Sequence, residues 1–227
     1  MNQQDAILNL DTLITNIEKS RLNISEHHIV QTVAVSKYST SDDIITLYQA
    51  GQRAFGENKV QDLAKKADTL QDYPISWHFI GSLQKNKINQ LIDLSPVLMH
   101  SLSSLELSEE LDKRLKVKDK KMNCLLQINS AKEDSKSGVS PTEAINIYKN
   151  IKQNYSNINL IGIMSIGAHS EDKELIKKSF DTTYEIFEEL EKEFNDTKIC
   201  SMGMSGDYEI AISKGSNMIR VGSALFK

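Results

Sequence analysis

The sequence predicts an α/β protein: a single (β/α)8 TIM-type barrel with an extra helix at its amino terminus. Eight short apolar or β-branched runs alternate along the chain with polar stretches of helical spacing. The runs are apolar along their length, which is typical of parallel strands covered on both faces. Eight such strands with intervening helices favour a closed barrel, and a doubly wound open sheet is the alternative.

The eight runs are expected to be the eight strands, in chain order. They are residues 32–35, 53–56, 77–80, 97–102, 124–128, 160–166, 198–202 and 218–221. No linker rich in Pro, Gly or Ser and no shift in composition divides this pattern. We therefore predict one domain over residues 1–227, with a helix and lead-in over about 1–30 and the barrel over 31–227.

The stretches between the runs carry apolar residues at helical spacing. Examples are residues 44–48, 60–67 and 180–190. The sequence SPTE at 140–143 predicts a capping box that begins a helix, and Gly51 and Gly215 lie where helices should end. Because the sequence stops at Lys227, no helix is expected after the eighth strand. The amino-terminal helix is expected to cover that part of the barrel wall.

The composition indicates a soluble globular protein, with 39% hydrophobic and 26% charged residues. A net charge of −4 gives no basic surface for nucleic acid, and no segment approaches the ~20 apolar residues of a membrane span. Cys124 and Cys200 lie in apolar runs and are expected to be reduced, and the first residues show no basic leader. A cytoplasmic protein is therefore expected. The histidines lack metal-ligand spacing, so no metal site is expected.

The carboxyl ends of barrel strands are where functional groups gather. The first strand leads directly into Lys37. A lysine leaving a strand is usually a plain surface residue. At the mouth of an apolar barrel, however, it would be partly desolvated, which favours the neutral amine that attacks an aldehyde. Lys37 is therefore a candidate Schiff-base lysine.

Glycines and serines follow the seventh strand, in SMGMSG (201–206), and the eighth, in RVGSA (220–224). Barrels often hold phosphate on these two loops, where glycine lets the backbone approach an anion. Polar residues are also expected at this rim after strands two, three and five, at 57–58, 81 and 135–138. His78 lies within the third run and is expected to be a hydrogen-bonded core residue rather than a catalytic one.

Together these motifs resemble one family, the pyridoxal phosphate homeostasis proteins (the YggS family). The resemblance covers nearly the whole chain and the motifs occur in family order. They are AVSK (34–37), GQRAFGEN (51–58), WHFIGSLQKNK (77–87), LLQIN (125–129), SKSG (135–138), SMGMSGD (201–207) and RVGSALF (220–226).

The resemblance implies a barrel like the amino-terminal domain of alanine racemase that holds pyridoxal 5′-phosphate (PLP) as an aldimine on Lys37. It implies that the loops after strands seven and eight hold the phosphate, with Arg220 beside the pyridine nitrogen and Asn58 near the ring. An arginine there disfavours protonation of that nitrogen. The implied cofactor-binding residues are Lys37, Asn58, Ser201, Met202, Ser205, Arg220, Gly222 and Ser223.

The function implied is intracellular PLP homeostasis without established turnover, so no catalytic residue is assigned. PLP is the expected partner, PLP-dependent client enzymes are candidate partners, and a monomer is expected. The main alternative is a PLP-dependent amino-acid racemase-like enzyme. It is disfavoured because the opposing tyrosine of alanine racemases comes from a second domain that the 227 residues do not contain. A barrel aldolase that uses Lys37 without PLP is a third possibility.

Overall fold

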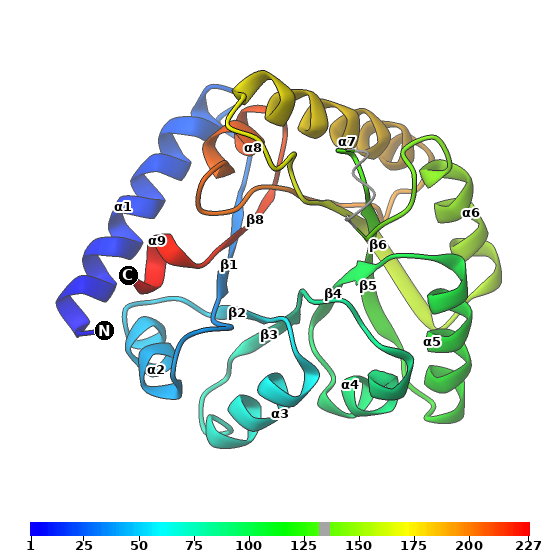
Figure 1. Ribbon diagram of the computed structural model, residues 1–227, viewed down its shortest axis with the longest axis horizontal. Helices are drawn as coiled ribbons and strands as arrows, with labels where there is room; N and C mark the ends of the chain where they lie inside the picture. The colour runs from blue at the N-terminus through cyan, green and yellow to red at the C-terminus, as the bar shows by residue number, and fades with distance from the viewer. Residues whose placement is uncertain (132–136) are drawn as a thin grey trace.

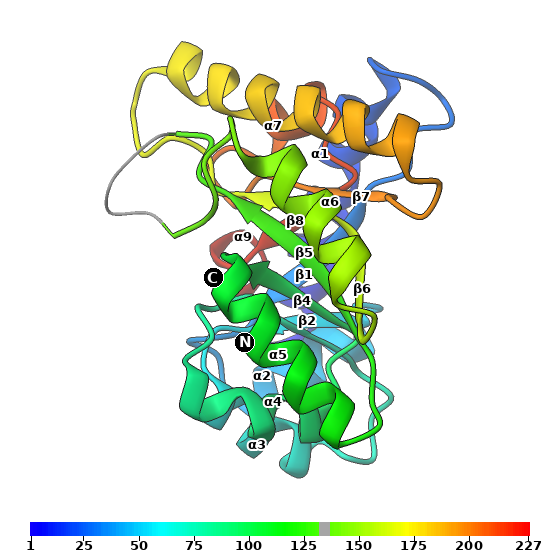
Figure 2. The same ribbon diagram turned by 90° about the vertical axis from the view of Figure 1, so that its right-hand side faces the viewer.

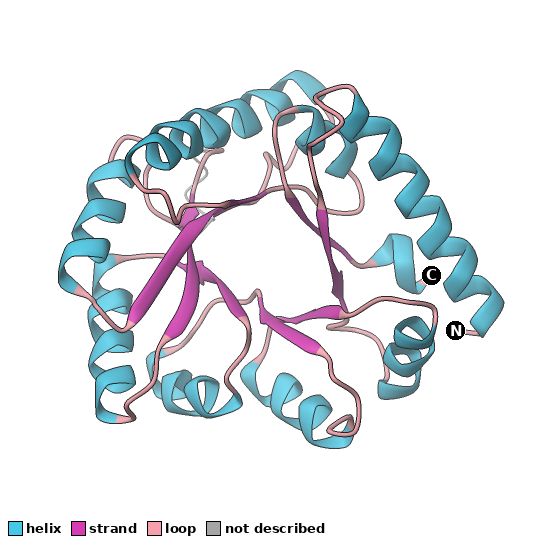
Figure 3. Ribbon diagram, turned by 180° about the vertical axis from the view of Figure 1, so that it is seen from behind, coloured by secondary structure: helices cyan, strands magenta, loops and turns pink. Residues whose placement is uncertain are grey.

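The eight apolar runs form eight parallel strands that close into one barrel, as Figure 3 shows from behind. The computed structural model describes residues 1–131 and 137–227. The strands are β1 (Gln31–Val35), β2 (Ala54–Glu57), β3 (Ser76–Phe79), β4 (Leu98–Leu102), β5 (Met122–Ile128), β6 (Ile158–Ser165), β7 (Ile199–Ser201) and β8 (Met218–Val221). Strands adjacent in sequence are adjacent in the sheet, and β8 pairs with β1. The closed barrel is therefore confirmed, and the open sheet is wrong.

Helices surround the barrel on its outside (Figure 1). They are α1 (Gln3–Leu22), α2 (Ser41–Gln49), α3 (Val60–Thr69), the 3-10 turn η1 (Lys85–Lys87), α4 (Ile88–Leu94), α5 (Leu105–Val117), α6 (Ala144–Asn154), α7 (Lys173–Glu193), α8 (Tyr208–Ser213) and α9 (Ser223–Phe226). None of the helices in the described part of the chain is long and apolar enough to cross a membrane.

The helix ends agree with the sequence in part. Gly51 and Gly215 follow α2 and α8 with φ of 123° and 91°, a conformation that glycine adopts without steric cost. The predicted capping box at 140–143 is wrong, because those residues form a turn in which the Glu143 N–H donates to the Ser140 carbonyl. Helix α6 begins only at Ala144, without a side-chain cap.

Helix α1 covers the barrel wall beside β8, as predicted. Its buried face packs into one apolar cluster with residues of α2, α8 and α9, and Figure 1 shows α1 beside α8 and α9. The expectation that no helix follows β8 is wrong, because the short α9 does. The side-chain amide of Asn9 on α1 donates to the carbonyls of Leu225 and Lys227, at 3.2 and 2.8 Å, and so ties the two helices together.

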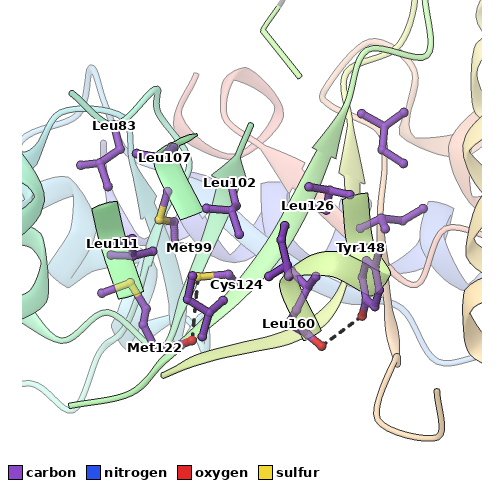
Figure 4. Packing of buried hydrophobic residues seen from close by; sticks show 14 of the residues in the cluster. Leu83, Met99, Leu102, Leu107, Leu111, Met122, Cys124, Leu126, Tyr148 and Leu160 are labelled. Carbon is purple, nitrogen blue, oxygen red and sulfur yellow. Dashed lines mark hydrogen bonds between the residues drawn. The ribbon is translucent and has the colours of Figure 1, made fainter. Parts of the chain in front are cut away.

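The core has two layers, one inside the barrel and a larger one between the strands and the outer helices, of which α5, α6 and α7 face the viewer or lie on top in Figure 2. In Figure 4, Met99 and Cys124 of the strands pack toward Leu111 of α5, while the Tyr148 hydroxyl donates to the Leu160 carbonyl at 3.0 Å. The inner layer consists of Val33, Leu98, Leu125, Met164 and Met218. Because this layer fills the barrel, a site must lie beyond it, at the carboxyl ends of the strands.

Candidate functional site

A cavity of about 700 Å³ opens at the carboxyl ends of the strands. Its walls come from the ends of β1, β6 and β8 and from the loops after β2, β3 and β7. Six of the eight residues predicted from the sequence line it: Lys37, Asn58, Ser205, Arg220, Gly222 and Ser223. The other two, Ser201 and Met202, are buried and do not line it.

Lys37 reaches the cavity because it follows β1 with the same alternation as Val35, which also lines it. The side chain is exposed rather than partly desolvated as expected, so the barrel mouth leaves the amine open to solvent. Its Nζ lies 5.0 Å from the centroid of the Tyr38 ring, which is 91% exposed. The amine is therefore accessible to an aldehyde that enters from solution.

The loop after β7 is hydrogen-bonded to the loop after β8 through the side chain of Ser205. The Ser205 Oγ accepts hydrogen bonds from the backbone N–H groups of Gly222 and Ala224, at 3.1 and 3.4 Å. A methyl group added at Gly206 would meet no atom within 4 Å, so the backbone there faces open space. Backbone N–H groups and serine hydroxyls that gather on such loops are the donors that phosphate sites use.

Arg220 is a buried cation on the cavity wall, 5% exposed. Its Nη1 donates to the Ser201 carbonyl at 3.0 Å and to the Ser201 Oγ at 2.6 Å, and its Nη2 donates to the Ser165 carbonyl at 2.9 Å. Burial lowers the pKa of Arg220 to about 10, which leaves the guanidinium charged at neutral pH. Its described hydrogen-bond partners are neutral oxygens, and the nearby Asp207 carboxylate favours the charged form of the guanidinium, so the cavity wall carries a charged donor.

Behind Arg220 lies a row of buried polar side chains. Ser201 Oγ lies 3.4 Å from His100 Nδ1, and His100 Nε2 lies 2.9 Å from His78 Nδ1. Because Ser201 Oγ accepts from Arg220, its proton is free to point to His100 Nδ1, and His100 then donates from Nε2 to His78. Burial lowers the pKa of His78 to about 4 and that of His100 well below its usual range. His78 is thus a hydrogen-bonded core residue, as expected.

Two features of the rim differ from the sequence expectation. Glu57 was expected at the rim, but its side chain is buried behind it, where Oε1 contacts Lys66 and Ser36. The alternation of side chains along a strand could have predicted this. Because Asn58 lines the cavity, the side chain of the preceding Glu57 points to the other side of the strand. Residues 135 and 136 of the expected fifth polar segment lie outside the described residues. Within the described chain, no three His, Cys, Asp or Glu residues group as metal ligands.

Comparisons with known proteins agree with this geometry. The family model described as alanine racemase, N-terminal domain, matches residues 8–227. The pyridoxal phosphate homeostasis protein of Helicobacter pylori (strain J99) is 50% identical over 218 residues, which cover 96% of each chain. The human protein of that name is 37% identical over 205 residues, which cover 86% of this chain and 74% of the human one.

Solved structures show the same fold. PipY of Synechococcus elongatus, solved with PLP bound, superposes with a TM-score of 0.82 at 28% identity and covers 98% of this chain and 100% of PipY. An alanine racemase of Clostridium difficile has a TM-score of 0.76 at 16% identity, over 99% of this chain and 56% of the racemase. The chain belongs to the family of the pyridoxal phosphate homeostasis proteins and has the barrel of the alanine racemase N-terminal domain.

Proposed function

We propose that this protein binds PLP in the barrel cavity and takes part in intracellular PLP homeostasis. One observation carries the proposal: an accessible lysine, the glycine- and serine-containing loops after β7 and β8, and a buried guanidinium all line the same cavity. These groups fit the aldehyde, the phosphate and the ring nitrogen of PLP. The names of the relatives and the PLP bound to PipY support the same cofactor.

Each residue has a role that its position supports. The amine of Lys37 would hold the cofactor's aldehyde covalently, and Ser205, Gly222 and Ser223 would bind the phosphate. Arg220 would face the ring nitrogen and, because it stays charged, would disfavour a second positive charge there.

The other three residues named from the sequence differ in their roles. Asn58 would contact the ring. Ser201 supports the site from behind through its bonds to Arg220. Met202 packs in the apolar layer outside the barrel. When bound, PLP supplies an electrophilic aldehyde and an electron-withdrawing ring.

We propose a carrier rather than an enzyme. Racemisation needs two groups that exchange a proton on opposite faces of the substrate carbon. Among the described residues that line the cavity the tyrosine is Tyr38, next to Lys37 on the same strand end, which does not favour an opposing position. We propose a cytoplasmic monomer that exchanges PLP with client enzymes. The exposure of the Lys37 amine supports exchange, because the cofactor can reach and leave it from solution.

The covalent site is tested by adding PLP to the purified protein, following the absorbance, reducing with borohydride and mapping peptides. The phosphopyridoxyl mass should lie on Lys37 and disappear in Lys37→Ala. It should persist in Lys85→Ala, whose lysine is a surface residue paired with Glu106. A mass on another lysine would refute the assignment, and absence of bound PLP would refute the function.

The carrier role is tested by incubating the PLP-loaded protein with L-alanine and other L-amino acids. We expect no D-isomer above background and no deuterium exchange at the α-carbon. Turnover near ~1–10³ s⁻¹, the ordinary enzyme range, that is lost in Lys37→Ala would establish the racemase alternative instead.

A further inference from the structure

A buried ion pair lies directly behind the cavity, between α3 and the ends of β1 and β2. Lys66 Nζ contacts Glu57 Oε1 at 2.7 Å, with the Glu57 side chain fully buried and that of Lys66 13% exposed. The same ammonium donates to the backbone carbonyl of Ser36 at 2.7 Å, and the Ser36 hydroxyl donates to Glu57 Oε1 at 2.6 Å. The Glu57 carboxylate and the Lys66 ammonium thus connect the ends of β1 and β2 with α3.

This cluster is one residue away from two cavity residues. Side chains alternate along a strand, so Ser36 and Glu57 point toward α3 while their successors, Lys37 and Asn58, line the cavity. The strands are paired at this level, with the Ser36 N–H donating to the Gly56 carbonyl at 3.0 Å. A displacement of the Ser36 carbonyl would therefore change the direction in which Lys37 leaves β1.

Stability alone does not account for the cluster. A buried ion pair is often no more stable than apolar side chains of the same volume, because both charges lose their hydration. Here the carboxylate is also incompletely bonded, since the buried Glu57 Oε2 has no hydrogen-bond partner among the residues that the structure describes. An apolar pair would fill this space without that cost, but it would leave the Ser36 carbonyl without its ammonium donor.

We propose that Glu57 and Lys66 are positioning residues that hold the Ser36 carbonyl, and so set the orientation in which the Lys37 amine meets the cofactor's aldehyde. The Lys66 ammonium donates a hydrogen bond to the Ser36 carbonyl. The Glu57 carboxylate accepts hydrogen bonds from Lys66 and from the Ser36 hydroxyl and so fixes both. The inference rests on the proposed function, because it assigns the geometry of the same amine. It adds two residues that do not line the cavity.

The test uses the double variant Glu57→Leu/Lys66→Met, which replaces the pair by apolar side chains and leaves no unpaired buried charge. The Ser36 hydroxyl keeps the Gly56 carbonyl, at 3.4 Å, as an acceptor. Two quantities are measured in the full-length protein: the rate at which PLP becomes borohydride-trappable on Lys37, and the affinity for pyridoxine 5′-phosphate. The second ligand has no aldehyde and reports the rest of the cavity.

We expect the double variant to fold and to bind pyridoxine 5′-phosphate as the wild type does, but to trap PLP on Lys37 roughly 10- to 100-fold more slowly, as misplaced reacting groups do. Lys66→Arg keeps the charge and the donors and should recover part of the rate. Lys65→Met changes the exposed neighbouring lysine on α3 and should have the wild-type rate. The single variants Glu57→Gln and Lys66→Met should lower stability, because each leaves one buried partner uncompensated.

A wild-type trapping rate in the folded double variant would overturn the inference and leave the pair a purely structural role. Equal loss of pyridoxine 5′-phosphate affinity and trapping would also overturn it, since the cluster would then support the whole cavity. These outcomes differ from a failure of the proposed function, in which the wild-type protein itself would give no trapped product on Lys37.

Discussion

The buried histidine pair predicts a loss of stability in mild acid. His78 is 6% exposed, and burial lowers its pKa from 6.5 to about 4. Between these two values the unfolded chain binds a proton that the folded protein does not, so stability rises with pH. The contribution is complete above about pH 6.5 and is lost as the pH falls toward 4.

The size follows from the separation of the two pKa values. Each pH unit between them corresponds to about 1.4 kcal/mol, so His78 accounts for a loss of about 3 kcal/mol between pH 6.5 and pH 4. His100 acts in the same direction, because burial, then His78 and Arg220, also lower its pKa. For a domain that is marginally stable, a loss of this size is a large fraction of the total.

The assay is urea unfolding at pH 7, 6, 5 and 4.5, comparing the wild type with His78→Gln. The glutamine amide does not titrate and can replace the hydrogen bond of His78 to His100, so the variant's free energy of unfolding should fall less steeply below pH 6.5. His27→Gln changes an exposed histidine and should keep the wild-type slope. Identical slopes for the wild type and His78→Gln would refute the reasoning, since His78 would then not be buried in its neutral form.

Three glycine substitutions separate the phosphate site from the packing of the barrel. Gly206→Ala meets no protein atom within 4 Å, so its melting temperature should be unchanged while PLP binds more weakly and pyridoxal does not. Equal weakening of both ligands in titrations would place the phosphate elsewhere. In Gly222→Val the added Cβ lies 3.3 Å from the Val35 carbonyl oxygen. We expect this variant to lower the affinity for PLP more than Gly206→Ala does, and titrations with PLP and with pyridoxal compare the two losses. Gly215→Ala puts a methyl group 2.1 Å from the Tyr184 ring at a φ of 91°. We expect urea denaturation to show a loss of about 2–4 kcal/mol, and a loss under about 1 kcal/mol would contradict it.

The order of elements was readable from the sequence because it depends on local patterns. Apolar runs of strand length separated by helical spacing predict parallel strands, and their number predicts closure. The position of Lys37 directly after the first run placed it at the rim for the same reason. The helix ends at Gly51 and Gly215 also depend only on local backbone conformation, which glycine alone adopts without steric cost.

The direction in which each side chain points was decided by the tertiary structure. Strands buried on both faces are apolar on both, so the sequence does not reveal which residues face the interior. That is why Ser201 and Glu57, expected at the site, lie behind it, and why the contact of Glu57 with Lys66 was not foreseen. The exposure of Lys37 likewise depends on how the loops around it close, which only the folded barrel determines.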